Sequence, residues 1–237
     1  FTIHKKIYRQ KSMSEFRFQL ADNLFNHTLF IVDEASMISN TGTETAFGSG
    51  RLLDDLVQFV YSSDGCSLLL LGDTAQLPPV MQPHSPALES NQLAGYALHV
   101  HEFTLTHVVR QALESGILHN ATLLRHQLTE EKTNEFPHFE LANFPDIKKL
   151  SGMELIDEIQ RSYDGVGVED TIVVTRSNKR ANKFNEGIRS TILYKESDIS
   201  VGDLIMVVKN NYFWLEANEK IDFIANGDIA EIISIGK

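Results

Sequence analysis

The sequence predicts an α/β fold built on a parallel sheet, because two apolar runs each end in acidic residues. Residues 28–34 read TLFIVDE, and residues 67–73 read SLLLLGD. A short apolar run bounded by polar residues is typical of a strand covered on both faces, as in a parallel sheet. A third run of this kind, TIVVT, occupies residues 171–175.

The acidic residues after the first run are candidates for a nucleotide site. In open α/β sheets, ligands bind at the carboxyl ends of the strands, where Asp33 and Glu34 are expected. Two adjacent carboxylates suit a magnesium nucleotide, because one can hold the water shell of the metal and the other can orient an attacking water. Taken alone, the stretch fits a solvated acidic turn equally well.

The second run continues into residues that suit the same site. Gly72 permits a tight exit from the strand, and the amide of Gln76 can both donate and accept a hydrogen bond. Pro78 and Pro79 hold the following chain extended and stiff. A plain surface turn is the alternative for this proline pair.

Four stretches carry a family resemblance: VDEASM at 32–37, GDTAQLPPV at 72–80, LTHVVRQ at 105–111 and TIH at 2–4. They resemble, in that order, the Walker B motif, the third and fourth helicase motifs, and a DNA-side motif. These are motifs of superfamily 1 helicases, in the RecD-like and Dda-like branch that moves 5′ to 3′ on DNA.

The resemblance implies RecA-like parallel-sheet domains of the P-loop NTPase type and an ATP-dependent DNA helicase activity in DNA repair or recombination. It implies ATP and Mg²⁺ as cofactors. Asp33 would hold the Mg²⁺ ion through water, Glu34 would polarise the attacking water, and Gln76 would sense the γ-phosphate. Arg110 would stabilise the charge of the transition state, and Asp73 would belong to the same nucleotide site.

The resemblance also implies contacts with single-stranded and double-stranded DNA. Residues of the predicted DNA interface are Thr2, His4, Pro78, Thr175, Arg176 and Ser177. The last three lie where a helix is expected to begin, and a helix start suits a phosphate. Subunits of a nuclease complex are possible partners, as for the alpha subunit of exodeoxyribonuclease V.

The expected domain organisation follows the motifs. Residues 1–105 would be the remainder of a first RecA-like domain, residues 106–195 part of a second, and residues 196–237 an incomplete SH3-like β insert. A hairpin around the NG turn at 226–227 is equally compatible with the last segment. No G-x-x-x-x-G-K-[ST] loop occurs in the sequence, so we expect a fragment of a longer helicase that is inactive alone.

Composition and charge restrict the classes of protein to which the chain can belong. A hydrophobic content of 42% with 22% charged residues is that of a globular protein, and no apolar run approaches the roughly 20 residues that span a membrane. A single cysteine, Cys66, fits a reducing cytoplasm. The net charge of −11 argues against nucleic acid, but two basic clusters soften that argument. A solvated surface explains either cluster about as well as a DNA groove does. The clusters are Lys5, Lys6, Arg9, Lys11 and Arg17, and Arg176, Lys179, Arg180, Lys183 and Arg189.

Periodicity predicts the helices. Apolar residues at helical spacing predict helices over 52–60 and 113–128, and a capping box at 151–154 predicts a helix start. A further helix is expected from Ser177, and a short strand at 103–105. Alternation over 15–20 fits either a short hairpin or a plain connecting strand.

Two other functions remain compatible with the sequence. One is a P-loop ATPase that acts on RNA, either PhoH-like or RNA-helicase-like; the TIH stretch and the proline pair favour the DNA branch. The other is a catalytically inactive DNA-binding subunit of a nuclease complex. The complete set of Asp33, Glu34, Gln76 and Arg110 argues against an inactive protein.

Overall fold

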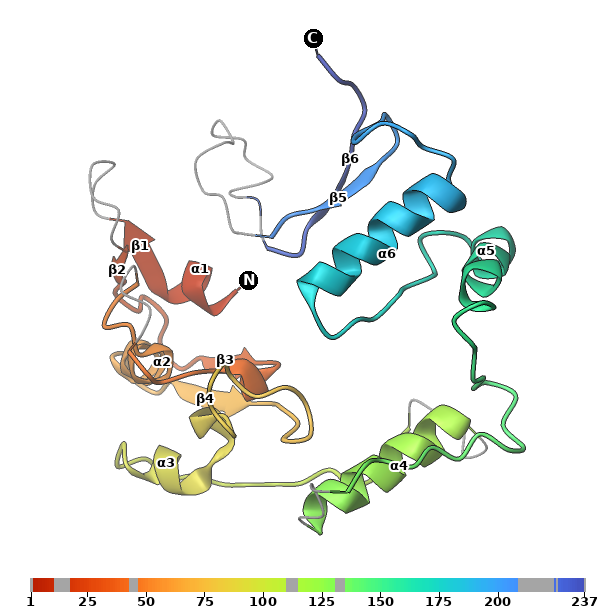
Figure 1. Ribbon diagram of the computed structural model, residues 1–237. Helices are drawn as coiled ribbons and strands as arrows, with labels where there is room; N and C mark the ends of the chain where they lie inside the picture. Colours follow the sequence, from red (N-terminus) through yellow and green to blue (C-terminus); the bar gives the residue numbers. More distant parts are fainter. Residues whose placement is uncertain are drawn as a thin grey trace. The chain divides into compact units, whose positions relative to one another are not determined.

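Two parallel strands form the centre of the first of two structural units. The computed structural model describes residues 2–10, 18–42, 47–109, 115–130, 135–208, 224 and 226–236. Its contacts divide the chain into the units Phe1–Ile147 and Lys148–Lys237 (Figure 1).

Both units mix helices and strands. The first contains α1 (Ile3–Ile7), β1 (Tyr8–Gln10), β2 (Phe18–Leu20), β3 (Leu29–Val32), η1 (Ala35–Met37), α2 (Leu52–Tyr61), β4 (Ser67–Leu70), η2 (Pro86–Leu88), α3 (Ser90–Ala94) and α4 (Gly116–Thr129). The second contains α5 (Leu155–Gly165), α6 (Asn178–Thr191), β5 (Leu204–Met206) and β6 (Ile229–Glu231). The prediction of an α/β chain with parallel strand pairing is therefore confirmed at this level.

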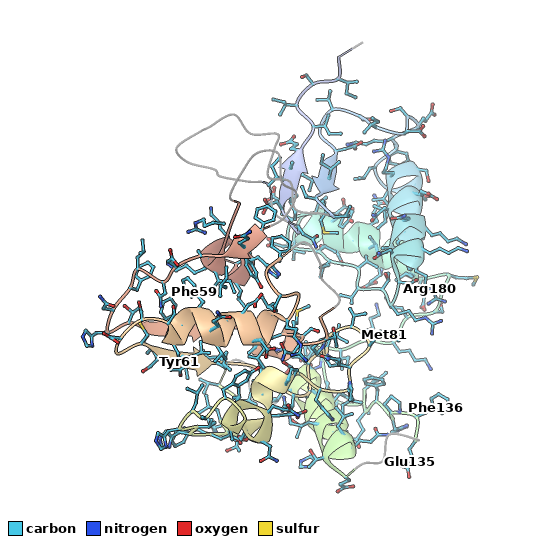
Figure 2. The ribbon with its side chains drawn as sticks, turned by 90° about the vertical axis from the view of Figure 1, so that its left-hand side faces the viewer. Phe59, Tyr61, Met81, Glu135, Phe136 and Arg180 are labelled. Carbon is cyan, nitrogen blue, oxygen red and sulfur yellow. The ribbon has the colours of Figure 1, made fainter. Side chains whose placement is uncertain are left out.

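Strands β3 and β4 pair in parallel, with Leu29 opposite Ser67 and Val32 opposite Leu70. Helix α2 covers one face of this pair, as predicted from its apolar spacing. The ring of Phe30 meets the ring of Phe59 edge-on, with 5.8 Å between the ring centroids. Figure 2 labels Phe59 on α2. The main core lies between this helix and the sheet, and its largest fully buried side chains are Ile7, Leu53 and Val60.

The expectation that both strands are covered on both faces is wrong for the described residues. Leu29 and Ile31 of β3 are 55% and 61% exposed, and Leu69 and Leu71 at β4 are 41% and 42% exposed. Successive side chains of a strand point to opposite faces, so a helix on one face leaves every second residue uncovered.

The chain before β3 is tied to α2 by a buried hydrogen bond. Tyr8 Oη donates to Asp55 Oδ2 at 2.6 Å, and the Ser49 amide donates to the same oxygen at 3.0 Å. Strands β1 and β2 pair antiparallel, with Tyr8 opposite Leu20. Residues 18–20 are thus a strand of an antiparallel pair, and the partner strand lies earlier in the chain.

Helix α4 is fixed at its start by Asp146. Ser115 Oγ donates to Asp146 Oδ2 at 2.7 Å, and the Gly116 amide donates to Oδ1 at 2.9 Å. Asn120 exchanges two hydrogen bonds of 2.8 Å with the backbone of Glu140. These bonds join the helix to the irregular segment that follows it.

In the second unit, the predicted capping box is confirmed. The Ser151 amide donates to Glu154 Oε2 at 2.9 Å, and the Glu154 amide donates back to Ser151 Oγ at 3.4 Å. Helix α5 follows directly, and Ile159 packs against Ile188 and Ile192 in the core of this unit.

Helix α6 begins as predicted, because Ser177 Oγ accepts a hydrogen bond from the Arg180 amide at 3.3 Å. The end of α6 is tied to the start of β5 through Asp203, which is 8% exposed. Its carboxylate accepts from Lys195 Nζ at 2.7 Å and from the guanidinium of Arg189. The Lys195 ammonium, and then Arg189, hold the pKa of Asp203 well below its usual range.

Two predicted strands are not strands in the part of the chain that the structure describes. Residues 171–175 pair with no other described strand, and Ile172 and Val174 are 85% and 84% exposed. The same holds for residues 103–105, where Phe103 and Leu105 are 88% and 95% exposed. An apolar run becomes a strand only where a neighbouring strand takes its backbone hydrogen bonds.

At the end of the chain, β5 and β6 pair antiparallel, with Met206 opposite Ile229. Gly227 has a φ of 95°, and its amide donates to the Val207 carbonyl at 2.8 Å. None of the helices in the described ranges is long and apolar enough to cross a lipid bilayer.

Candidate functional site

The parallel register brings the two acidic strand ends to one edge of the sheet. Beyond the paired residues, the Leu71 amide donates to the Val32 carbonyl at 2.8 Å. The Ala35 amide then donates to the Leu71 carbonyl, also at 2.8 Å. Asp33 and Glu34 therefore leave β3 beside the point where Gly72 and Asp73 leave β4.

Glu34 has a left-handed backbone conformation, with φ of 55° and ψ of 39°. Asp33 supports this turn, because its Oδ1 accepts a hydrogen bond from the Glu34 amide at 2.9 Å. A residue with a Cβ in this conformation costs roughly 1–2 kcal/mol. Such strain is concentrated at functional sites, where it aims a side chain. Both carboxylates are exposed at the strand end.

Gly72 is required by close packing on the exit of β3. A Cβ on this residue would lie 3.0 Å from the Ser36 backbone nitrogen and 2.8 Å from Leu88 Cδ1. The sequence predicted a tight strand exit at Gly72, and the structure gives the physical cause, which is the approach of η1 and η2.

A buried serine clamps these two short helices together. Ser85 is 5% exposed, and its Oγ lies 2.8 Å from the carbonyl oxygens of both Ala35 and Ile38. The hydroxyl also accepts from the Ala87 amide at 3.3 Å. Sequence reasoning missed Ser85, whose only signal was its position before a proline, where it caps η2.

A cavity of about 320 Å³ lies beside this edge. Residues that line it include Ser36, Thr74, Gln76, Pro78, His84 and Glu89. Gln76, the predicted phosphate sensor, and Pro78, the predicted DNA contact, thus share one cavity. The Ser36 hydroxyl is buried and has no hydrogen-bond partner among the described residues. The side chains that line the cavity carry hydroxyl, amide, imidazole and carboxylate groups, each of which can hydrogen-bond to a ligand.

An arginine that the sequence reasoning did not single out binds Asp73. Arg125 of α4 donates from both of its terminal nitrogens, at 2.6 Å to Asp73 Oδ2 and 3.2 Å to Oδ1. The hydrogen bonds from Arg125 are the main reason that the pKa of Asp73 lies below its usual range, and the Ala75 amide at 2.9 Å adds to the effect. The signal in the sequence that could have found Arg125 was a basic residue on a predicted helix.

The residues fit a hydrated Mg²⁺ ion better than a directly ligated one. Within the described ranges, no group of three or more histidine, cysteine or acidic side chains converges on a point. Mg²⁺ keeps several waters and needs only one or two carboxylates together with substrate phosphates. Asp33, with one oxygen engaged by the Glu34 amide, can orient such waters through the other.

The other predicted residues of the first unit have local roles. Thr2 caps α1, because its Oγ1 accepts from the Lys5 amide at 3.3 Å. The ring of His4 packs edge-on against Phe47, with ring centroids 4.9 Å apart. Arg110, the predicted transition-state cation, lies outside the described residues.

In the second unit, Thr175, Arg176 and Ser177 lie together at the start of α6. Thr175 Oγ1 donates to the Ser177 carbonyl at 3.1 Å, and Ser177 caps the helix. Arg176 is exposed, as are Lys179, Arg180 and Lys183 on the first turns of the helix. Figure 2 labels Arg180 on this helix. Arg189, counted in the same basic cluster, is instead engaged by Asp203.

No protein-family model matches the chain, and no curated protein matches it.

Proposed function

We propose that the chain is part of an ATP-dependent DNA helicase of the RecD-like type, which moves 5′ to 3′ in DNA repair or recombination. The observation that carries the proposal is the parallel register of β3 and β4, which brings Asp33 and Glu34 to the same sheet edge as Asp73. The left-handed backbone of Glu34 supports it, because strain at a charged residue is typical of active sites.

The roles follow from the chemistry of the side chains. When bound, ATP would supply the γ-phosphoryl group that is transferred to water, and Mg²⁺ would offset the charge of the phosphates. Asp33 would orient the water ligands of the metal, and Glu34 would accept the proton of the attacking water. Gln76 would donate to the γ-phosphate from the loop after β4. Arg110 would stabilise the charge that develops in the transition state.

For DNA, we propose two contact regions within one cytoplasmic protein. Thr2, His4 and Pro78 belong to the first unit, and residues 175–177 directly precede α6 in the second. Four exposed basic side chains at this helix start favour a phosphate backbone there, because cations and helix amides both attract anions. Subunits of a nuclease complex are the protein partners that this assignment suggests.

The test measures DNA-stimulated ATP hydrolysis in a protein that joins these residues to a G-x-x-x-x-G-K-[ST] loop, since the sequence contains none. Glu34→Gln is expected to slow hydrolysis by roughly 10²–10⁴-fold, the range for a positioned base, and to leave nucleotide binding nearly intact. Asp33→Ala is expected to weaken Mg²⁺-dependent binding more than Glu34→Gln does.

Glu169→Gln is the matched control, because Glu169 is an exposed glutamate of the second unit, and its turnover should equal that of the unmodified protein. Equal turnover in Glu34→Gln and Glu169→Gln would remove Glu34 from the reaction. A rate of ATP hydrolysis that does not rise when DNA is added would argue against a helicase.

A further inference from the structure

The ion pair between Arg125 and Asp73 occupies the edge at which the nucleotide is proposed to bind. Both terminal nitrogens of the guanidinium engage the carboxylate, which is the planar fork that arginine also makes with phosphate. Asp33 and Glu34 lie at the same edge. A polyphosphate that arrives there meets carboxylates that repel it and the guanidinium of Arg125, which attracts it.

The ion pair between Arg125 and Asp73 is accessible enough for a ligand to replace one partner. The side chain of Arg125 is 58% exposed and that of Asp73 is 34% exposed, so a ligand in solution can reach both. Exposed ion pairs are weak, because water screens them and two side chains must be held in one geometry. A phosphate oxygen can therefore replace the carboxylate without a large cost.

The helix that carries Arg125 is well anchored on its other side. Asp146 binds the start of α4, Asn120 bridges to Glu140, and Gln127 Nε2 donates to the Glu135 carbonyl at 2.7 Å. The Arg125–Asp73 pair thus connects the segment 115–147 to the end of β4. A change of partner at Arg125 would therefore remove one connection between α4 and the end of β4.

We propose that Arg125 is a phosphate-responsive latch, which binds Asp73 when the site is empty and transfers to a phosphate oxygen when a magnesium polyphosphate binds at the ends of β3 and β4. This inference rests on the proposed nucleotide site. It assigns Arg125 a ligand-binding role, through which occupancy of the site changes the contact between α4 and the end of β4. Because coupling is reciprocal, weakening the ion pair must tighten polyphosphate binding.

The experiment is a double-mutant cycle with magnesium tripolyphosphate as the ligand, titrated by calorimetry into a protein that joins these residues to a G-x-x-x-x-G-K-[ST] loop. NMR of the arginine Nε–Hε groups follows the same titration. Asp73→Asn removes a repulsive charge in any background, but it frees the guanidinium only where Arg125 is present. Asp73→Asn is therefore expected to tighten binding about two- to fivefold more with Arg125 than with Arg125→Gln, the strength of an exposed ion pair. The Arg125 Nε–Hε signal should shift on titration.

Arg161→Gln is the matched control, because Arg161 makes an exposed ion pair of 2.9 Å with Glu158 in the second unit. It should leave affinity and coupling unchanged. Equal effects of Asp73→Asn in both backgrounds, with binding otherwise retained and lost on Asp33→Ala, would overturn the latch alone. A chain that binds no tripolyphosphate at this edge in any variant would overturn the latch and the proposed nucleotide site together.

Discussion

The left-handed backbone of Glu34 predicts which of two substitutions, glycine or alanine, gives the more stable protein at position 34. Replacing Glu34 by alanine keeps the Cβ and its clash, whereas replacing it by glycine removes both. The clash is worth roughly 1–2 kcal/mol, and glycine loses roughly 0.5–1 kcal/mol through the entropy of the unfolded chain. At the midpoints of these ranges, Glu34→Gly is therefore expected to be more stable than Glu34→Ala by about 0.75 kcal/mol.

The assay is reversible thermal or urea unfolding of the two variants side by side. For a chain of this size the difference corresponds to an increase in Tm of about 1–4 °C for Glu34→Gly over Glu34→Ala. Ser62 is the matched control, because it is exposed and has an ordinary φ of −73°. There alanine should be the more stable of the two substitutions.

Two results would refute this reasoning. If alanine is the more stable residue at position 34 as well, Glu34 does not have a left-handed backbone in solution. If both variants keep full turnover in a protein that also carries a phosphate loop, Glu34 is not the base of the reaction. The functional interpretation requires that Glu34→Gly gain stability and lose hydrolysis together.

Three further predictions concern the supports of the site and the second unit. Ser85→Ala should cost about 1–3 kcal/mol of unfolding free energy in urea, because the single hydroxyl proton that the carbonyls of Ala35 and Ile38 share is lost from a buried position, whereas Ser190→Ala on the exposed face of α6 should be nearly neutral. Gly72→Ala should cost about 1–3 kcal/mol through overpacking, and Leu88→Ala in the same chain should recover only part, since the Ser36 backbone nitrogen stays 3.0 Å from the new Cβ. Asp203 has a folded-state pKa below its unfolded value, so its stabilisation is complete above about pH 4 and is lost as the pH falls further. Asp203→Asn should therefore lower Tm at pH 7 and flatten its decline in acid; parallel Tm curves for both proteins would contradict this.

Local rules predicted the helices well because their signals lie within one turn. The reciprocal bonds of Ser151 and Glu154 span three residues, and so does the bond from the Arg180 amide to Ser177. The amphipathic spacing of α2 predicted its buried face in the same way, since residues three and four apart share one side of a helix. Strands were predicted less well, because residues 103–105 and 171–175 have the composition of strands but pair with no strand in the described ranges.

The sequence by itself determined which acidic residues end the two central strands, where the helices begin, and that β3 and β4 suit a parallel sheet. Only the tertiary structure decided that one face of this sheet stays exposed, that Ser85 clamps Ala35 from 50 residues away, and that Arg125 binds Asp73 across 52 residues. Helix periodicity and capping depend on neighbours in the chain. The partner of a buried hydroxyl or of a guanidinium depends on which distant segments the fold brings together, and no local pattern encodes that choice.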